Sequence, residues 1–349
     1  MATGAGIAIV KRSTRNMNTI SNIPKAFIST VPFAVSNRLP IELLESAGID
    51  YQINPLGRRL KEDELVEMLD PFDILIAGTE PITDRVMASA RKLKIISRVG
   101  VGLDSVDLLA AEKRGIHVCY TPDAPAPAVA ELTIGLMLSL LRSVHVANLQ
   151  MHAGKWHRHF GRRIPEITLG IIGAGRIGGR VLRRIAAFGT PRVLINDIVP
   201  NKKLVPELKL EWVDKEEIYR EADLISLHVP LTAQTHNMIR REQLMMMKKT
   251  TLLINVSRGG IVNEGDLAEA LRSGRLGGAA IDVFEHEPYA GELSGIEQCL
   301  LTSHMGSMSV DCRTRMEIEA TEEVVRFVLG KPLQGLVPST EYDVQRARV

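Results

Sequence analysis

Short apolar runs alternate with amphipathic runs along the chain from Lys25 onward. The first apolar runs, predicted to be strands, cover residues 25–30, 73–78, 94–100 and 117–121. The runs predicted to be helices cover residues 41–48, 83–90 and 106–115. This alternation is typical of a parallel sheet with helices on both faces.

A second series follows a connector with three prolines, PDAPAPAVAE at residues 122–131. It opens with a long apolar helix predicted at about residues 127–146. The predicted strands then cover residues 168–173, 192–197, 224–229, 251–256, 278–283 and 299–304. A helix at about residues 309–329 is expected to end the ordered chain. Apolar residues are nearly continuous in these strands, as expected when both faces are buried.

We therefore predict two doubly wound α/β domains, each built on a parallel sheet, with a cleft between them. One domain covers residues 125–306. The other is discontinuous and covers residues 1–124 and 307–349. Residues 1–22 are expected to be a disordered extension, although their lack of acidic residues leaves a mitochondrial presequence as the alternative.

Composition excludes several function classes. The 349 residues carry a formal net charge of +2 and only 4% aromatic residues, which argues against nucleic acid or an anionic membrane as partner. The longest strongly apolar stretch, residues 132–141, is far short of the roughly 20 residues that span a bilayer. Three scattered cysteines form neither a disulfide framework nor a metal site and indicate a cytoplasmic protein with no metal.

The first chemical motif is GAGRIG at residues 173–178, between a predicted strand and a predicted helix. Gly173 permits a tight turn, Gly175 lets the backbone approach a pyrophosphate, and Gly178 lets the helix pack on the strand. Asp197 ends the next strand, where it can accept hydrogen bonds from a ribose and repel a 2′-phosphate. This context predicts a dinucleotide site that prefers NAD.

Three further candidates also follow predicted strands. Arg258 lies in SRGGIVNE, Asp282 and Glu287 lie in DVFEHEP, and His304 lies in TSHMGS. Ligands of such sheets bind beyond the carboxyl ends of the strands, where a carboxylate can pair with an imidazole and favour its protonated form. Taken singly, each could instead be an exposed charge or a structural histidine.

Together these motifs resemble the D-isomer-specific 2-hydroxyacid dehydrogenase family, and within it the short proteins similar to D-3-phosphoglycerate dehydrogenase. The resemblance covers about residues 25–335, and its matching segments are RVGVGLDSVD at 98–107, VAE at 129–131, LGIIGAGRIG at 169–178, LISLHVPLT at 224–232, LINVSRGGIVNE at 253–264, AIDVFEHEP at 280–288 and LTSHMG at 301–306. It implies a Rossmann nucleotide domain, a flavodoxin-like substrate domain and NAD as the cofactor. The chain ends soon after Gly335, so the regulatory domain of the long enzymes is not expected.

The resemblance also assigns the reaction, in which a hydride passes between nicotinamide C4 and C2 of a small 2-oxo or D-2-hydroxy acid. Arg258 is expected to bind the substrate carboxylate. His304 is expected to act as the acid or base, with Glu287 as its partner. The backbone at Val99 and Gly100 is expected to receive the same carboxylate.

For the cofactor, the resemblance places Arg176 and Ile177 on the pyrophosphate and Asp282 near the nicotinamide carboxamide. The remaining cofactor contacts that it implies, beside the glycines and Asp197, come from His228, Pro230, Thr235 and Val256. It also implies a homodimer formed through the nucleotide domain.

Two alternatives remain open. A formate dehydrogenase of the same fold lacks the glutamate partner of the histidine, so Glu287 argues against it. An NADH-sensing corepressor-like module keeps the same three residues and is distinguished by its lack of turnover.

The substrate is not named by the sequence. In phosphoglycerate dehydrogenases an arginine commonly ends the strand equivalent to 73–78 and reaches the substrate phosphate, whereas this chain has Ala77 and then Glu80. Phosphohydroxypyruvate is therefore not expected to be the best substrate, because a nearby carboxylate repels a phosphate. The alternative is that Glu80 points to solvent and that another arginine, such as Arg98, supplies the charge.

Overall fold

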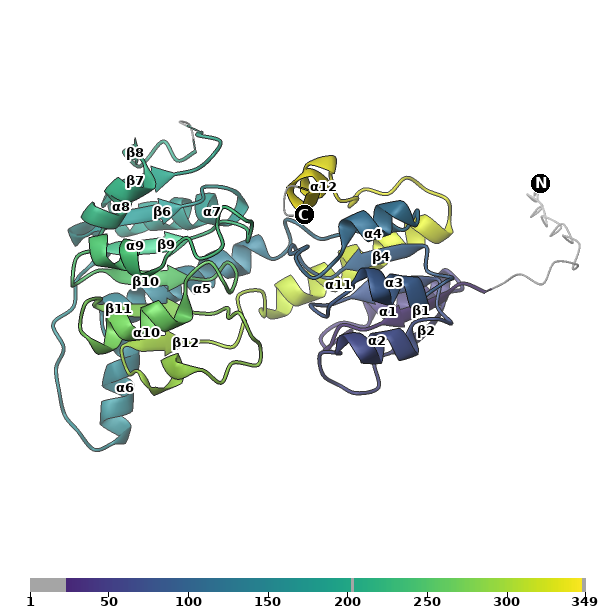
Figure 1. Ribbon diagram of the computed structural model, residues 1–349, viewed down its shortest axis with the longest axis horizontal. Helices are drawn as coiled ribbons and strands as arrows, with labels where there is room; N and C mark the ends of the chain where they lie inside the picture. The colour runs from purple at the N-terminus through teal and green to yellow at the C-terminus, as the bar shows by residue number, and fades with distance from the viewer. Residues whose placement is uncertain (1–22, 202–203, 347–349) are drawn as a thin grey trace, which may run out of the picture.

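The computed structural model describes residues 23–201 and 204–346 and contains two all-parallel sheets, one in each lobe of the molecule (Figure 1). This confirms the predicted fold class. The expectations for residues 1–22 lie outside the described residues.

The first sheet has five strands in the order β2-β1-β3-β4-β5. Their bounds are β1 (Lys25–Ile28), β2 (Asp50–Ile53), β3 (Ile74–Ala77), β4 (Ile95–Arg98) and β5 (His117–Cys119). The chain leaves β1 toward β2 and returns to β3 on the other side of β1. The carboxyl ends of β1 and β3 therefore flank a topological switch point, where such sheets bind ligands.

The second sheet has seven strands in the order β12-β11-β10-β9-β6-β7-β8. Their bounds are β6 (Thr168–Ile172), β7 (Arg192–Asn196), β8 (Leu210–Trp212), β9 (Leu224–Leu227), β10 (Leu252–Asn255), β11 (Gly278–Ile281) and β12 (Cys299–Leu301). Here the switch point lies between β6 and β9, because the chain runs from β6 outward to β8 before it returns to β9.

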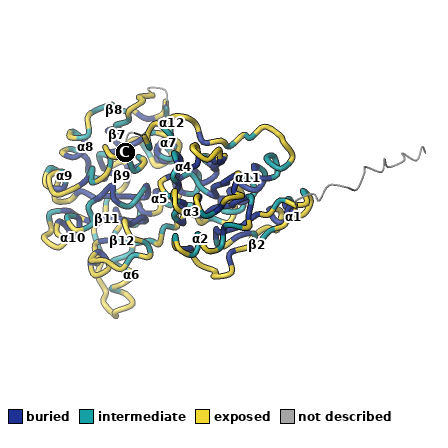
Figure 2. Tube along the Cα trace, turned by 45° about the vertical axis from the view of Figure 1, so that its right-hand side comes forward, coloured by how far each residue is buried: buried dark blue, intermediate teal, exposed yellow. Residues whose placement is uncertain are grey.

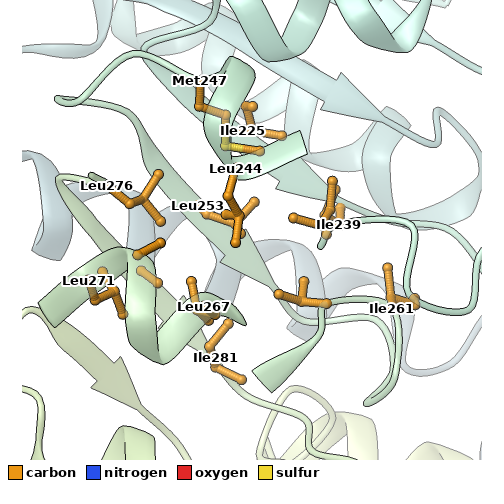
Figure 3. Packing of buried hydrophobic residues seen from close by; sticks show 14 of the residues in the cluster. Ile225, Ile239, Leu244, Met247, Leu253, Ile261, Leu267, Leu271, Leu276 and Ile281 are labelled. Carbon is orange, nitrogen blue, oxygen red and sulfur yellow. The ribbon is translucent and has the colours of Figure 1, made fainter. Parts of the chain in front are cut away.

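Each sheet is buried on both faces, which explains the continuous apolar runs in the sequence. In β10, Leu253 joins the core on one face of the seven-stranded sheet, while Leu252 and Ile254 join the core on the other. Figure 3 shows Leu253 packed among side chains from the neighbouring strands and helices. The central strands are accordingly among the most deeply buried parts of the molecule (Figure 2).

In the first lobe, the short helices are α1 (Leu39–Ser46), α2 (Glu62–Met68), α3 (Asp84–Ser89) and α4 (Leu108–Lys113). Thr83 and Asp107 begin α3 and α4 by accepting a hydrogen bond from a free backbone N–H of the first turn. The late helix α11 (Val310–Val328) packs on α1, β3 and β4, so a segment from the end of the chain completes this lobe.

The helices of the second lobe are α5 (Ala126–Leu141), α6 (Val144–His152), α7 (Arg176–Ile185), α8 (Lys215–Glu221), α9 (Arg241–Met246) and α10 (Glu264–Arg272). The expectation of one helix at about 127–146 is wrong. Ser143 adopts a left-handed conformation with φ 52°, and α6 turns away from α5 by 64°. Among the described residues no single helix is long and apolar enough to span a membrane, although α5 and α6 taken together have the length and composition of a bent span.

Two edge strands and the last helix are among the elements that the sequence pattern did not predict. Strands β2 and β8 lie at sheet edges and carry mostly polar or partly exposed residues, so they lack an apolar run. The helix α12 (Ser339–Arg346) has no buried residue, and it contradicts the expectation that the ordered chain ends near residue 329. It packs on α4 (Figure 1).

Two neighbouring residues of α9, one buried and one exposed, allow the packing of the second lobe to be tested. Leu244 is 1% exposed and Met245 is 59% exposed. Leu244→Ala should lower the free energy of unfolding by about 2–5 kcal/mol, because it leaves a cavity in a packed core. Met245→Ala should change it by less than about 0.5 kcal/mol. Urea unfolding measures both, and equal effects would contradict the described packing.

Candidate active site

A cleft of about 1000 Å³ lies between the two lobes. Its walls come from the loops that follow the carboxyl ends of strands in both sheets. The predicted site residues that line this cleft are Val99, Gly100, Arg176, Ile177, His228, Pro230, Val256, Arg258, Asp282, Glu287 and His304. The others, Gly173, Gly175, Gly178, Asp197 and Thr235, lie in adjoining loops and not among its lining residues.

The loop between β6 and α7 has the close contacts that its glycines allow. Gly173 has φ +94°, and a Cβ there would collide with the His228 carbonyl. A Cβ on Gly178 would collide with the Gly173 carbonyl oxygen, whereas one on Gly175 would meet nothing within 4 Å. The open side of this turn at Gly175, at the start of α7, is where a pyrophosphate can approach the backbone.

Asp197 follows β7 and lies beside this loop. One carboxylate oxygen accepts the Ala174 N–H at 2.6 Å, and the other accepts the Val199 N–H at 2.8 Å. A carboxylate has about four acceptor positions, so this one can still accept hydrogen bonds from ribose hydroxyls.

His228 follows β9 on the opposite side of the switch point. Its Nε2 lies 3.0 Å from the Ser226 hydroxyl, and its buried Nδ1 has no protein partner within the described residues. Burial lowers the pKa of His228 to about 3, so the ring is neutral at physiological pH. Pro230 lines the cleft near it, while Thr235 shapes this loop by donating to the Pro230 carbonyl at 2.6 Å.

Arg176 and Ile177 line the cleft at the start of α7. Arg176 Nε lies 3.2 Å from Asp123 Oδ1 in the connector between the lobes. Arg176 would therefore have to leave Asp123, at least in part, to bind a pyrophosphate as expected. Val256, after β10, is buried in the cleft wall.

His304 and Glu287 form a hydrogen-bonded pair. His304 Nδ1 lies 2.9 Å and 3.0 Å from the two carboxylate oxygens of Glu287, which also accepts the Phe284 N–H at 3.1 Å. Burial opposes ionisation of Glu287, but the bond to His304 outweighs it with the other contacts, and the pKa of Glu287 is lowered. The pairing assigns the proton of Nδ1 to this bond and leaves Nε2 for a substrate.

Asp282 holds the loop that carries His304. Its carboxylate accepts hydrogen bonds from the Thr302 hydroxyl at 2.6 Å, the Met305 N–H at 2.9 Å and the Gly306 N–H at 3.0 Å. Its carbonyl accepts the His304 N–H at 2.8 Å. Asp282 lines the cleft, and these three bonds leave one acceptor position on its carboxylate, so its expected place near the nicotinamide carboxamide stays a prediction.

Arg258 crosses the cleft to the other lobe. Its Nε donates to Asp104 Oδ1 at 2.8 Å, and its Nη1 donates to the Ser257 carbonyl at 2.7 Å. Burial disfavours the charge on Asp104, but Arg258, assisted by Arg98 and the backbone, lowers the pKa of Asp104 to about 2. Asp104 was not among the site residues predicted from the sequence.

Val99 and Gly100 line the cleft, but their amides are already used. The Val99 N–H donates to the Ala77 carbonyl at 2.9 Å, and the Gly100 N–H donates to the Thr121 hydroxyl at 2.8 Å. In this conformation both amides are occupied, so their expected contact with the substrate carboxylate stays a prediction. Among the described residues, the amides of Val101 and Gly102 have no protein acceptor, so the available donors lie one step further along the chain.

The far end of the cleft holds two buried side chains of opposite charge, Glu80 and Arg98. Glu80 is 1% exposed and accepts hydrogen bonds from the Ser29 hydroxyl and, at 2.7 Å, from the Gly78 N–H. Arg98 is 4% exposed and donates to the carbonyls of Gly78 and Gly102, the latter at 3.0 Å. Glu80 therefore does not point to solvent, and Arg98 does lie at the site.

The cysteines are not candidates for nucleophilic chemistry. All three are buried, and burial raises the pKa of Cys299 to about 12 and that of Cys312 to about 11. Across residues 23–201 and 204–346, no three His, Cys, Asp or Glu side chains are grouped to hold a metal ion.

The chain is similar in sequence to proteins of one known family. The model of the D-isomer specific 2-hydroxyacid dehydrogenase, NAD binding domain, matches residues 134–306. The hydroxypyruvate reductase of Thermotoga maritima is 35% identical over 282 residues, which are 79% of this chain and 91% of that enzyme. The D-3-phosphoglycerate dehydrogenase of Methanocaldococcus jannaschii is 37% identical over 303 residues, but these are only 57% of its length and 85% of this chain.

Solved structures show the same architecture. The D-lactate dehydrogenase of Aquifex aeolicus, complexed with NAD and lactic acid, superposes with a TM-score of 0.78 at 27% identity, over 88% of this chain and 96% of that one. The sequence match over most of the Thermotoga enzyme, the NAD-binding profile and the shared fold lead to one conclusion: the chain belongs to the D-isomer specific 2-hydroxyacid dehydrogenase family.

Proposed function

We propose that this chain is an NAD-dependent oxidoreductase that interconverts a small 2-oxo acid and its D-2-hydroxy acid, with Arg258, Glu287 and His304 as the catalytic residues. The observation that carries the proposal is the contact of His304 with Glu287 at 2.9 Å in the same cleft as Arg258. A glutamate partner on the histidine argues against a formate dehydrogenase.

His304 is the proton donor in the direction of reduction. Glu287 holds Nδ1, which orients the ring and leaves Nε2 to give a proton to the C2 oxygen. In oxidation the same nitrogen takes the proton from the hydroxyl. NAD supplies the hydride acceptor or donor at its nicotinamide.

Arg258 binds the substrate carboxylate and stabilises the charge that develops on the C2 oxygen. Its guanidinium retains donors after its bonds to Asp104 and Ser257, and a forked cation suits a planar carboxylate. The unpaired amides of Val101 and Gly102 supply additional donors for the same anion.

The residues around the β6–β9 switch point fit a dinucleotide. The turn at Gly173–Gly178 has no room for side chains at Gly173 and Gly178 but is open at Gly175, and Asp197 lies beside it. Asp197 would bind the adenosine ribose and select NAD over NADP by repelling a 2′-phosphate.

We also propose that the protein is a cytoplasmic homodimer that pairs through the nucleotide-binding lobe. Exposed apolar side chains gather on α6 and the loop after it, at Leu149, Met151, Trp156 and Phe160. None of the residues of α6 is buried (Figure 2). A patch of this kind on a single chain commonly marks a protein interface.

Turnover tests the main proposal. NADH oxidation should be measured with hydroxypyruvate, glyoxylate, pyruvate and phosphohydroxypyruvate. His304→Ala should lower kcat by about 10²–10⁴-fold without changing NADH affinity, because it removes the acid but not a cofactor contact. His286→Ala, an exposed histidine on the neighbouring loop, is the control. NADH binding without turnover of any 2-oxo acid would favour the sensing module.

The glycine loop allows the cofactor site to be tested separately from the fold. Gly175→Ala should weaken NADH binding about tenfold or more, since its Cβ would occupy the approach of the pyrophosphate, while the melting temperature stays unchanged. Gly178→Ala should lower both NADH affinity and melting temperature, because its Cβ collides with the Gly173 carbonyl. Gly295→Ala, with open space in a remote turn, is the control. Unchanged NADH titrations for both loop variants would contradict this cofactor site.

The opposite charges of Glu80 and Arg98, at the far end of the cleft, predict whether a phosphorylated or an unphosphorylated substrate is preferred. Glu80 offsets the charge of Arg98, so kcat/KM for hydroxypyruvate should equal or exceed that for phosphohydroxypyruvate. Glu80→Gln should shift the ratio toward the phosphorylated acid by about tenfold, because it removes a repulsive carboxylate. Glu67→Gln, on the exposed face of α2, should not. A strong wild-type preference for phosphohydroxypyruvate that Glu80→Gln leaves unchanged would refute this role of Glu80.

A further inference from the structure

Arg258 belongs to the nucleotide-binding lobe, but a loop of the opposite lobe determines how its guanidinium lies. Residues 99–107 follow β4 of the five-stranded sheet, and Arg258 follows β10 of the seven-stranded sheet. The two segments meet at the Asp104–Arg258 ion pair, 2.8 Å long, which is half-buried in the cleft. A residue proposed for catalysis therefore has its main side-chain partner on the other side of the cleft.

Gly102 forms the surface on which the guanidinium rests. A Cβ at this position would overlap Arg258 Nη2 and come within 3.0 Å of Asp104 Oδ1. The backbone of Gly102 does not adopt a positive φ, so an alanine is conformationally permitted there. The side chain that would have to move is the far end of Arg258, not the fold around it.

Asp104 selects which edge of the guanidinium is free. Its carboxylate accepts a hydrogen bond from Arg258 Nε, and the Ser257 carbonyl accepts one from Nη1. The Nη2 end remains, beside Gly102, whose amide has no protein acceptor. A substrate carboxylate at this point can bind Nη2 and the amides of Val101 and Gly102 together.

The loop is itself fixed at its far end by α12. The Gln345 side chain accepts the Leu108 N–H at 2.7 Å and donates to the Val106 carbonyl at 2.8 Å. The Asp107 side chain also begins α4 by accepting the Ala110 N–H at 2.8 Å. Gly102 and Asp104 thus sit on a loop with an anchored base, as a positioning surface requires.

We propose that Gly102 and Asp104 are positioning residues for Arg258, which hold its guanidinium from the opposite lobe so that Nη2 faces the substrate carboxylate. The proposal rests on the proposed function of Arg258. It adds that the arginine is correctly oriented only while the two lobes face each other across the cleft, so substrate binding and lobe arrangement are coupled through this contact.

Two variants test the proposal by different routes. Asp104→Asn removes the charge that holds Nε, and Gly102→Ala displaces Nη2. Each should lower kcat/KM about 10–100-fold for the best 2-oxo acid, as small misplacements of a substrate-binding group do. The loss should include a raised KM, with NADH affinity and melting temperature unchanged. Calorimetric titration of oxalate into the protein with NADH should show weaker binding by a similar factor.

A combined variant separates positioning from a general effect. In an Arg258→Lys background, Asp104→Asn should cause less than about a twofold further loss, because the fork that it positions is gone. Asp107→Asn, the same charge change in the same loop, is the control, since asparagine also caps a helix. Wild-type behaviour of Asp104→Asn and Gly102→Ala, or losses that multiply fully with Arg258→Lys, would overturn the proposal.

These outcomes are distinct from failure of the proposed function. A wild-type protein that binds NADH but neither reduces a 2-oxo acid nor binds oxalate contradicts the role of Arg258, and with it this inference. A wild-type protein that does both, with unaffected variants, contradicts the positioning role alone.

Discussion

Parallel pairing of every strand is the constraint on which the rest of this structure depends. In a parallel sheet all carboxyl ends lie on one edge, so the residues that follow the strands are brought together whatever their separation in sequence. Arg258, Asp282 and His304 follow three adjacent strands of the seven-stranded sheet and meet for this reason. The loops after β1, β3 and β4 of the other sheet face them across the cleft. The cost of such pairing is that both faces must be covered, and in the first lobe α11, from late in the chain, covers one face together with α1 while α2, α3 and α4 cover the other.

This constraint also explains how much of the structure could be predicted. Strands that are buried on both faces have continuous apolar sequences, so the two sheets could be predicted. Glycines at positions with no room for a Cβ form a recognisable motif, so the turn at Gly173–Gly178 could be predicted as well. The edge strand β2 was missed because only one of its sides is paired and its residues are largely exposed. The break at Ser143 was missed because a left-handed serine leaves no signal in an apolar pattern.

The site was predictable in its residues but less so in their contacts. A strand-end position places a side chain at the cleft but does not say where it points. The Asp282 carboxylate accepts hydrogen bonds from the loop that carries His304, and the amides of Val99 and Gly100 donate hydrogen bonds to acceptors in their own lobe. Asp104 had no motif of its own, because its importance comes from a residue more than a hundred and fifty positions away on the other lobe.

His304 has a backbone conformation that an ordinary residue avoids, with φ 51°. A non-glycine residue in this region stores of order 1–3 kcal/mol of strain unless its surroundings compensate. Here the compensation comes from Asp282, which binds the loop on both sides of the histidine. Glycine at this position would relax the backbone while removing the proposed proton donor. Stability of the turn and the proposed proton transfer therefore place opposite demands on this position.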